Sequence, residues 1–408
     1  MAFTVTPLCR NDEHVFNPFF FQLSSSNSTK LNHRFIADIY HGLVSPTDSY
    51  AGRFKFPVRP DGYGIFSPAR VLESFVQSNI TPSADQFVGS LTPQRAYSIK
   101  WGEEYDNSAT LTGSTGVTIY SAITTNPTFG YVLNSAHPYE NNFALSATVE
   151  YNVISATPIL LTDWSYLTPK KIRRAEWETI ACFRVLSNTI KIQTFDSGST
   201  QVGEFLLQNG YNSGTIRYNL GIGTNNLDFS HNNELTSTTE PILPANVHSY
   251  LITMEFNGAE RSAGYTYEID DSCLLYETTR IAWLNQFGSH DFFTFKLIKR
   301  ESINRKNTEW EQYLPYNYSI GDRGRTNLGV EVKKKISVTT DWLTDAEATF
   351  LDKCAQSQEH WLIDSNGNAL PLILVDTTPD VGQSILTDRI FNRTFNFEYA
   401  FSQNTQRT

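Results

Sequence analysis

The sequence has little of what most catalytic or metal-binding proteins display. Its 408 residues include four cysteines, Cys9, Cys182, Cys273 and Cys354, and no two of them form a CxxC pair. This spacing argues against a disulfide framework and against a zinc site, and it predicts free, mostly buried thiols in a reducing cytoplasm. No stretch of 18 apolar residues occurs, so we expect no membrane span.

Basic charge is also scarce. The chain has 32 Lys and Arg against 42 Asp and Glu, which gives a net charge of −10. A protein that binds the phosphate backbone presents a basic face, so we do not expect nucleic acid as a partner. Two short basic runs, at 170–174 and 333–335, are interpreted as solvated faces or sheet edges.

Motifs that carry catalysis are missing as well. The chain has no Walker A sequence, no Gly-x-Ser-x-Gly and no His-Glu-x-x-His. The segment 221–226 resembles a glycine-rich phosphate loop, but it lacks the third glycine and is not expected to open the helix of a βαβ unit. The best catalytic-looking pair, His290 beside Asp291, is interpreted as a turn before a strand.

Acidic pairs do not suggest an enzyme either. In Glu103-Glu104 and Asp270-Asp271, neighbouring side chains point to opposite sides of a strand, so neither pair can flank a sugar as a glycosidase requires. No spaced Asp-x-Asp-x-Asp calcium loop exists. We therefore predict a non-enzymatic protein with no catalytic residue, no cofactor and no metal.

Aromatic and alternating segments are what the chain has in abundance. It contains 27 Phe and 20 Tyr, and Phe35, Ala37 and Ile39 alternate with Arg34 and Asp38 as in a half-buried strand. The segments 252–256 and 293–297 alternate in the same way, and 395–401 has an aromatic face. The predicted fold class is mainly β, with multi-domain antiparallel β-sandwich-type domains and a few short helices.

Helix and turn signals are few. Ser67-Pro68 resembles an N-cap followed by proline and predicts a helix over roughly 68–78. Thr344 and Glu347 form a capping box that opens a second helix. Asn366-Gly367, between two apolar runs, predicts a hairpin. The segment 170–186 is compatible with either a helix or a strand.

Domain boundaries are predicted where the composition changes. A Pro-rich segment near 156–158 and a polar stretch over 301–330 separate three candidate domains. They are an N-terminal β-rich domain with one short helix (1–158), a central β-sandwich-type domain (159–300) and a C-terminal α+β module (301–408).

Four different short aromatic segments, called phrases below, occur one after another along the chain. They are Phe16-Asn17-Pro18, Pro60-Asp61-Gly62-Tyr63-Gly64, the stretch from Trp283 to Phe292, and the stretch from Asp341 to Glu347. Together they resemble a virion structural family of tailed phages that infect Bacteroidetes-type bacteria. The resemblance covers nearly the whole chain and implies a tail-associated virion component, and it brings no catalytic residues with it.

The phrases are expected to specify the fold rather than a binding site. In the third phrase, Asn285 and Gly288 suit a tight turn, Asp291 is expected to cap its backbone, and Trp283 and Phe292 are expected to pack with Phe295 beneath it. The other fold-signature residues are Pro60, Gly62, Gly64 and Trp342.

The function predicted from this resemblance is structural. We expect a tail hub, baseplate or tail-associated adaptor that assembles as a symmetric oligomer, with copies of itself and other virion proteins as partners. Its location would be the virion, assembled in the host cytoplasm. The alternative is a tail adhesin or fibre that binds a host-surface glycan, suggested by Trp310 in a polar context and by Asn/Thr-rich loops at 107–127 and 223–240.

Overall fold

The chain is a series of small sheets with few helices. In this computed structural model, the described residues are 3–7, 12–17, 19–41, 49–82, 88–89, 94–106, 118–121, 128–136, 160–183, 188–208, 217–229, 242–256, 258–260, 262–322, 324–375 and 392–401. Strands make up 51% and helices 8% of the structure, in several mostly antiparallel sheets. The fold class predicted from the sequence, mainly β with a few short helices, is confirmed.

Two sheets form the N-terminal part. The three-stranded sheet has the order β1 (Phe3–Pro7), β3 (Phe21–Ser25) and β6 (Tyr63–Phe66). The six-stranded sheet has the order β2 (Asp12–His14), β10 (Thr128–Leu133), β8 (Gln94–Asp106), β4 (Arg34–His41) and β5 (Tyr50–Pro57), with β9 (Thr118–Ser121) paired to β8. The sheets share one apolar core, in which the ring centroids of Phe21 and Trp101 lie 5.2 Å apart.

Strand β4 is more deeply buried than its alternation predicts. Phe35, Ala37 and Ile39 face the core as expected, but Asp38 on the opposite face is only 2% exposed. Arg53 lies opposite Asp38 on β5 and donates two hydrogen bonds of 2.7 Å to its carboxylate. This pairing satisfies the carboxylate, so the polar face of β4 can be covered.

The first helix is shorter than predicted. It consists of α1 (Ala69–Leu72), which continues as the 3-10 turn η1 (Glu73–Phe75). The N-cap position is Pro68, which makes no side-chain capping bond. The N-terminus of this helix therefore lacks the side-chain cap that Ser67 was predicted to supply, and Pro68 already has helical backbone angles.

The central part also packs two sheets together. The four-stranded sheet has the order β11 (Leu160–Leu161), β13 (Thr179–Phe183), β16 (Arg217–Gly221) and β7 (Val88–Gly89). The six-stranded sheet has the order β12 (Lys170–Ile172), β19 (Tyr265–Ile269), β17 (Ser249–Phe256), β14 (Asn188–Phe195) and β15 (Gln201–Gln208), with β18 (Ala259–Glu260) on β17.

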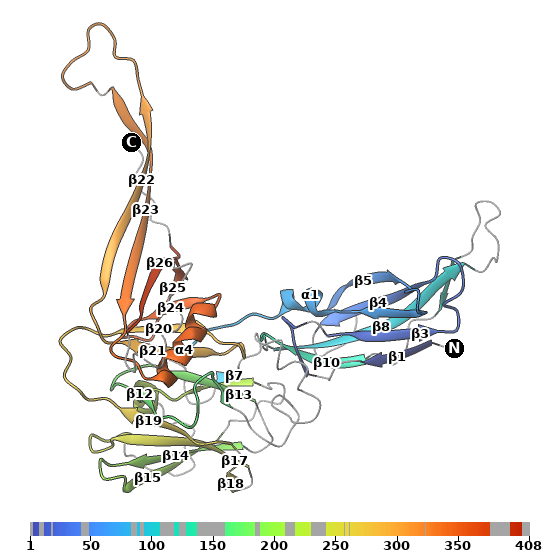
Figure 1. The fold of residues 1–408 in the computed structure, drawn as a ribbon, viewed down its shortest axis with the longest axis horizontal. Helices are drawn as coiled ribbons and strands as arrows, with labels where there is room; N and C mark the ends of the chain where they lie inside the picture. The colour runs from blue at the N-terminus through green and yellow to red at the C-terminus, as the bar shows by residue number, and fades with distance from the viewer. Residues whose placement is uncertain are drawn as a thin grey trace.

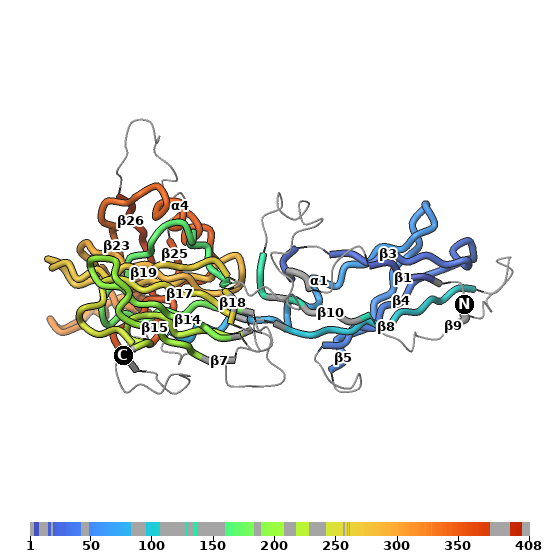
Figure 2. Tube along the Cα trace, turned by 90° about the horizontal axis from the view of Figure 1, so that it is seen from below, coloured from blue at the N-terminus to red at the C-terminus, as the bar shows by residue number. Residues whose placement is uncertain are grey.

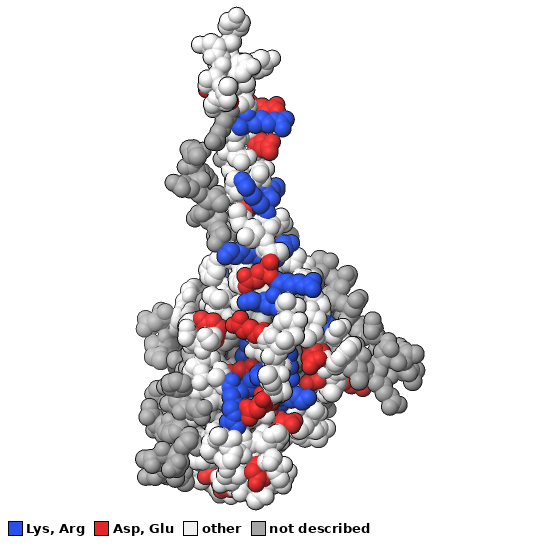
Figure 3. All heavy atoms as spheres, turned by 90° about the vertical axis from the view of Figure 1, so that its left-hand side faces the viewer, with Lys and Arg blue, Asp and Glu red and all other residues white. Residues whose placement is uncertain are grey.

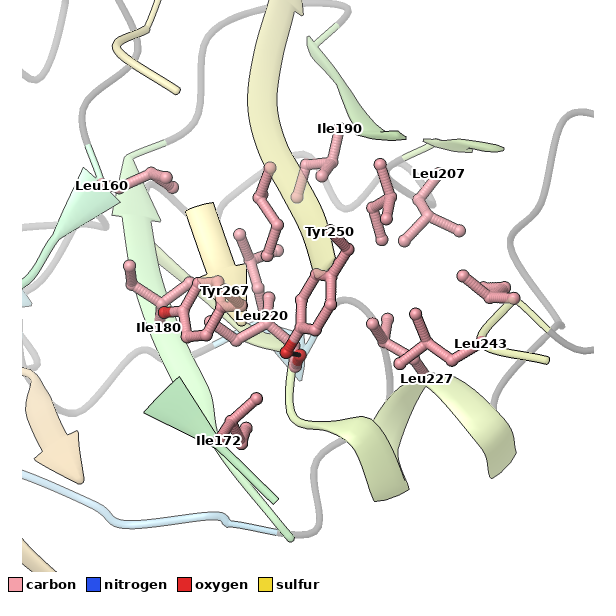
Figure 4. Close-up of a cluster of buried hydrophobic side chains, with 14 of the residues drawn as sticks. Leu160, Ile172, Ile180, Ile190, Leu207, Leu220, Leu227, Leu243, Tyr250 and Tyr267 are labelled. Atoms are coloured by element: carbon pink, nitrogen blue, oxygen red, sulfur yellow. Dashed lines mark hydrogen bonds between the residues drawn. The ribbon is translucent and has the colours of Figure 1, made fainter. Parts of the chain in front are cut away.

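Side chains from both central sheets meet in one buried cluster. Figure 4 shows Ile180 and Leu220 from one sheet and Ile190, Tyr250 and Tyr267 from the other, all converging on the space between them. The ambiguous segment 170–186 contains strands β12 and β13, and its residues 184–186 lie outside the described part. Part of the stretch predicted as a loop at 223–240 is helix α3 (Thr224–Phe229), and its residues 230–240 lie outside the described part.

A seven-stranded sheet forms the C-terminal part. Its order is β21 (His290–Phe295), β20 (Thr279–Leu284), β24 (His360–Ile363), β25 (Ala369–Leu374), β26 (Thr394–Tyr399), β23 (Arg325–Thr339) and β22 (Arg300–Glu311). Helix α4 (Asp345–Gln356) contributes Phe350 and Leu351 to its core. The boundary between this sheet and the central ones falls between residues 269 and 279, upstream of the predicted boundary at 300.

Two local predictions in this part are confirmed. Thr344 and Glu347 form the capping box of α4, with each side chain bonded to the backbone N–H of the other. The segment with Asn366 and Gly367 joins β24 to β25, and Gly367 has a positive φ of 79°. The aromatic face of β26 is confirmed for Phe395 and Phe397, whereas Phe401 lies beyond the strand and is 64% exposed.

A buried ionic cluster joins the central and C-terminal sheets. Arg280 of β20 donates hydrogen bonds of 2.6 Å to Glu176 and 2.5 Å to Glu178, and Lys170 of β12 donates one of 2.6 Å to Glu178. Thr294 adds a 2.8 Å bond to Glu176. Each of these charged residues is at most 8% exposed. The cluster therefore connects the two sheets through fully desolvated charges.

The N-terminal sheets form a separate elongated mass beside the other three sheets (Figure 2). Polar contacts join the two masses: the hydroxyl of Ser78 lies 3.0 Å from Nε2 of His290, and Asn226 donates a 2.8 Å bond to the carbonyl of Pro82. In Figure 1, the hairpin of β22 and β23 stands out from the C-terminal sheet, away from the rest of the molecule.

Candidate functional site

The third aromatic phrase forms the turn between β20 and β21. The side chain of Asn285 accepts hydrogen bonds from the backbone N–H groups of Phe287 (3.0 Å) and Ser289 (2.9 Å). Its carbonyl accepts one of 3.0 Å from Gly288, which has a positive φ of 70°. The predicted roles of Asn285 and Gly288 in a tight turn therefore agree with the geometry.

Asp291 has a different role from the one predicted. Its carboxylate accepts hydrogen bonds from the hydroxyl of Thr162 (2.5 Å), the backbone N–H of Asp163 (3.0 Å) and the side chain of Asn285 (3.1 Å). Instead of capping the backbone of its own turn, it ties that turn to the segment after β11. This contact crosses more than a hundred residues of sequence, so the local pattern does not contain it.

Trp283 and Phe292 lie on opposite faces of the sheet. Trp283 is fully buried, and its ring centroid lies 4.9 Å from that of Phe350 in α4, in the cluster that also holds Phe295. Phe292 is paired in register with Ala282 and packs with Ile363 in another cluster. The prediction that Phe292 packs beside Trp283 is wrong, because adjacent strand positions alternate between faces.

A pocket of about 530 Å³ opens beside this turn. It lies where the N-terminal segment approaches the C-terminal sheet, and the N–H of Ala136 donates a 2.8 Å bond to the carbonyl of Gln286. Its lining includes Phe16, Asn134, Ser135, Ala136, Asp163, Leu284, Asn285, Gln286, Lys353, Gln356, Ser357 and Gln358. Among these described lining residues, Asp163 is the one that carries a carboxylate.

The carboxyl group of Asp163 has a raised pKa, so it holds its proton more tightly than an ordinary aspartate does. Burial, followed by the nearby Asp291 carboxylate, raises the pKa of Asp163 to about 7. Burial raises the pKa of Asp291 as well, but the three hydrogen bonds that its carboxylate accepts favour the charged form. The shared proton therefore resides on Asp163, which accepts a 2.5 Å hydrogen bond from Gln286.

Asp163 gives the fold a pH dependence. A carboxyl that is protonated more readily when folded adds stability at low pH, and this contribution is lost as the pH rises through the folded pKa. We expect the contribution of Asp163 to the free energy of unfolding to fall between about pH 4 and about pH 7, by up to about 1.4 kcal/mol per pH unit. Asp163→Asn should flatten this fall. Urea unfolding at a series of pH values measures it, with Asp61→Asn on the surface as the control, and an unchanged slope in Asp163→Asn would contradict the assignment.

The carboxylates and histidines weighed in the sequence are held in structural contacts. Glu103 bonds to His33 at 3.0 Å and Glu104 to Lys55 at 2.6 Å, on opposite faces of β8. Asp270 pairs with Lys296 at 2.6 Å, and Asp271 pairs with Arg174. His290 bonds to Ser78 and its ring lies against Trp361, so its neighbour Asp291 does not orient it.

The glycine-rich segment 221–226 runs into a helix that begins at Thr224, but β16 before it and β17, the next described strand, belong to different sheets and form no βαβ unit. That helix, α3, has six residues, and backbone N–H groups at its start are already bonded: Gly223 donates to Glu178 and Asn225 donates to Glu176. A Cβ at Gly223 would lie 2.4 Å from the backbone nitrogen of Glu178. The segment therefore packs against the protein's own backbone instead of cradling a phosphate.

In the described part of the chain, no group of three or more His, Cys, Asp or Glu side chains is placed to hold a metal ion. None of the helices in that part has the length and apolar character needed to cross a bilayer.

The second aromatic phrase is a turn packed on the N-terminal core. Pro60 follows Arg59, whose carbonyl accepts a 2.9 Å bond from Gly62, and Gly62 has a positive φ of 83°. Gly64 lies so close to Phe35 that an added Cβ would be 2.3 Å from its ring. Gly62 is therefore suited to its positive φ, and Gly64 to its close packing against Phe35.

Gly64→Ala should destabilise the N-terminal sheets by about 1–3 kcal/mol, because fully buried Phe35 has no space to move. Gly329→Ala on β23, where a Cβ meets nothing within 4 Å, is the control and should change stability by about 0.5 kcal/mol or less. Hydrogen exchange of β4 and β6 measures the effect. Equal protection in Gly64→Ala and wild type would contradict this packing argument.

Trp342, the remaining signature residue, lies on the surface. It precedes the capping box of α4 and is 67% exposed, more than Trp310, which the sequence singled out and which is 51% exposed. Trp342 is therefore not a core residue. The apolar residues beside it in the sequence do not indicate whether its side chain is buried.

The most conspicuous surface feature is the hairpin of β22 and β23, together with the segment that connects them. We call residues 300–339 the arm and the remainder the body. Every residue of β22 is exposed, and the antiparallel ladder runs from Arg300 opposite Ser337 to Glu311 opposite Arg325. The sequence predicted a boundary at 301–330, because the polar residues of both strands hide the alternation that marks a strand.

The tip of the arm is apolar and exposed. Residues 312–321 contain no charged side chain, and Tyr313, Tyr316 and Ile320 are 99%, 104% and 106% exposed. Below the tip, Lys and Arg side chains are spaced along the arm (Figure 3). An exposed apolar tip of this kind marks an interaction site.

Neither the scan against protein-family models nor the search of curated proteins finds a match to this chain, so the comparisons assign it to no family.

Proposed function

We propose that the protein is a non-enzymatic structural component of a tailed-phage virion, a tail hub, baseplate or tail-associated adaptor that assembles as a symmetric oligomer. The observation that carries the proposal is the arm, a long hairpin with exposed faces and an apolar tip. Such an element contributes little to its own fold and is suited to contacts between subunits. The ordered phrases of the sequence add the virion context.

The rest of the described part supports a structural role over catalysis. Its buried charges are paired in contacts that join sheets, as in the cluster around Arg280. The pocket beside Asp163 presents one carboxylate, whereas glycoside hydrolysis requires two that face the substrate. We therefore assign no reaction to it.

The experiment is to purify the particles of a phage that encodes this chain and to quantify their proteins by mass spectrometry. The proposal expects the chain in a fixed ratio to other tail proteins, and immunogold labelling of the arm should mark the tail. A phage-encoded enzyme that is not packaged serves as the control for contamination. Absence of the chain from purified particles would refute the proposal.

The alternative is a tail adhesin or fibre that binds a host-surface glycan. Trp310, 51% exposed, and the tyrosines of the tip favour it, since aromatic rings stack on sugar faces. Most of the loop at 107–127 and residues 230–240 lie outside the described part, so the arm carries this alternative. A glycan array should then give a signal that Trp310→Ala removes and Trp342→Ala retains, and an empty array would argue against it.

A further inference from the structure

Among the described residues, the arm is paired with a third strand at its base alone. Strand β26 pairs with β23 over Lys335 to Thr339, and in the described part of the chain the outer portions of β22 and β23 pair with each other alone. A two-stranded hairpin is marginally stable in water without a third strand or a packed face. We therefore expect a ladder of this length to be stabilised by another surface that packs on it.

One face of the arm is the extension of the sheet's core-facing side. Ile336 and Val338 on β23 are fully buried in the C-terminal core. Alternate residues of a strand share a face, so Lys334 and Val332 continue the same face outward, with Lys334 exposed and Val332 half-buried. Ile303, on β22, shares this face because Glu301 lies opposite Ile336, and it is 66% exposed. Outside the core this face therefore carries the apolar Ile303 and Val332 beside the basic Lys334 and Arg305.

The charge of the arm is opposite to that of the body. Residues 300–339 contain eight Lys and Arg and five Asp and Glu, a net charge of +3. Subtracting this from the net charge of −10 leaves −13 for the body. Two arms would repel each other, whereas an arm and a body attract.

We propose that the arm docks on the body of a second copy of this chain, with the face that carries Ile303 and Val332 and the tip around Tyr316 and Ile320 covered by that copy. This contact deepens the proposed function, since it supplies the self-assembly that function requires. The surfaces joined are different, so the contact is heterologous: repeated from copy to copy it closes a ring or extends a filament. A membrane is the other surface that an apolar tip on a basic stem fits, and the test includes it.

The test compares the wild-type chain with an arm-shortened variant by light scattering. In this variant an Asn-Gly turn replaces residues 304–333 and joins Ile303 to Lys334, which lie opposite each other in the ladder. We expect a wild-type oligomer and a monomeric variant with an unchanged far-ultraviolet spectrum of the body. At about 1 M salt, where charges are screened within about 3 Å, the wild type should associate less tightly.

A point variant keeps the arm and removes its tip contacts. Tyr316→Ser with Ile320→Ser changes two fully exposed side chains, so folding is unaffected, and association should weaken about tenfold or more. The control is Leu167→Ser with Leu275→Ser, two body side chains that are 78% and 86% exposed, which should leave association unchanged.

Two outcomes overturn the proposal: a wild-type monomer, or an arm-shortened variant that keeps the wild-type mass. A monomeric wild type whose tip also binds phosphatidylglycerol vesicles would assign the arm to membranes. None of these results bears on whether the chain is present in purified particles. A packaged chain that is monomeric in isolation would therefore overturn this contact and leave the proposed function standing.

Discussion

Replacing Arg280 with methionine is expected to lower the free energy of unfolding by about 3–5 kcal/mol, because two buried carboxylates lose their shared partner. Arg280 bonds to Glu176 and Glu178 at 2.6 and 2.5 Å and also donates to the carbonyl of Trp177. Methionine keeps much of the volume but none of the five donors. Lys170 remains beside Glu178, so the charge on Glu176 bears most of the loss.

The matched control is Arg325→Met in the arm. Its ion pair with Glu311 is exposed, with side chains 71% and 68% accessible, so the unfolding transition should hardly move. Adding Glu176→Gln to Arg280→Met should recover part of the stability, since the unpaired charge is then removed. Hydrogen exchange of β13 and β20 locates the effect. Equal losses in Arg280→Met and Arg325→Met would show that the buried cluster is not a structural joint.

Trp283→Ala is expected to destabilise the C-terminal sheet by about 3–5 kcal/mol, because it removes one of the two tryptophan side chains of that core and leaves a cavity. Trp283 is fully buried, and its ring lies 4.9 Å from that of Phe350, which in turn lies 4.9 Å from Trp164. The loss should appear as faster hydrogen exchange in β20, β24 and α4. Trp283→Phe should be much milder, because it keeps an aromatic ring against Phe350.

Trp342→Ala is the control for this experiment. The same chemical change is made just before helix α4, at a side chain that is 67% exposed. We therefore expect the free energy of unfolding to change by about 0.5 kcal/mol or less. Both tryptophans belong to the aromatic phrases of the sequence. If both substitutions cost the same, burial would not be what distinguishes them, and the packing of α4 on β20 would need revision.

Local chemistry predicted several elements correctly. The capping box at Thr344 needs two side chains three residues apart, and the hairpin at Gly367 needs a residue that accepts positive φ. The alternation of Phe35, Ala37 and Ile39 depends on the period of a strand. Each of these signals is complete within a few residues, so the sequence alone contains it.

Other features of the structure come from contacts between distant segments, which local patterns do not contain. Asp291 bonds to Thr162 across the chain instead of capping its own turn, and Phe292 and Trp283 belong to different cores. The arm is a third case, since β22 and β23 are polar on the surface that they expose and resemble a linker in sequence.

The sequence by itself therefore determined the β-rich class of this protein, its capped helix α4 and its tight turns, because propensity and turn chemistry act over a few residues. The tertiary structure alone decided which charges are buried together, which face of each strand meets a core and where an uncovered hairpin leaves the sheet. Those outcomes depend on which segments become neighbours in space, and burial and electrostatic energy are set by those neighbours rather than by the order of residues along the chain.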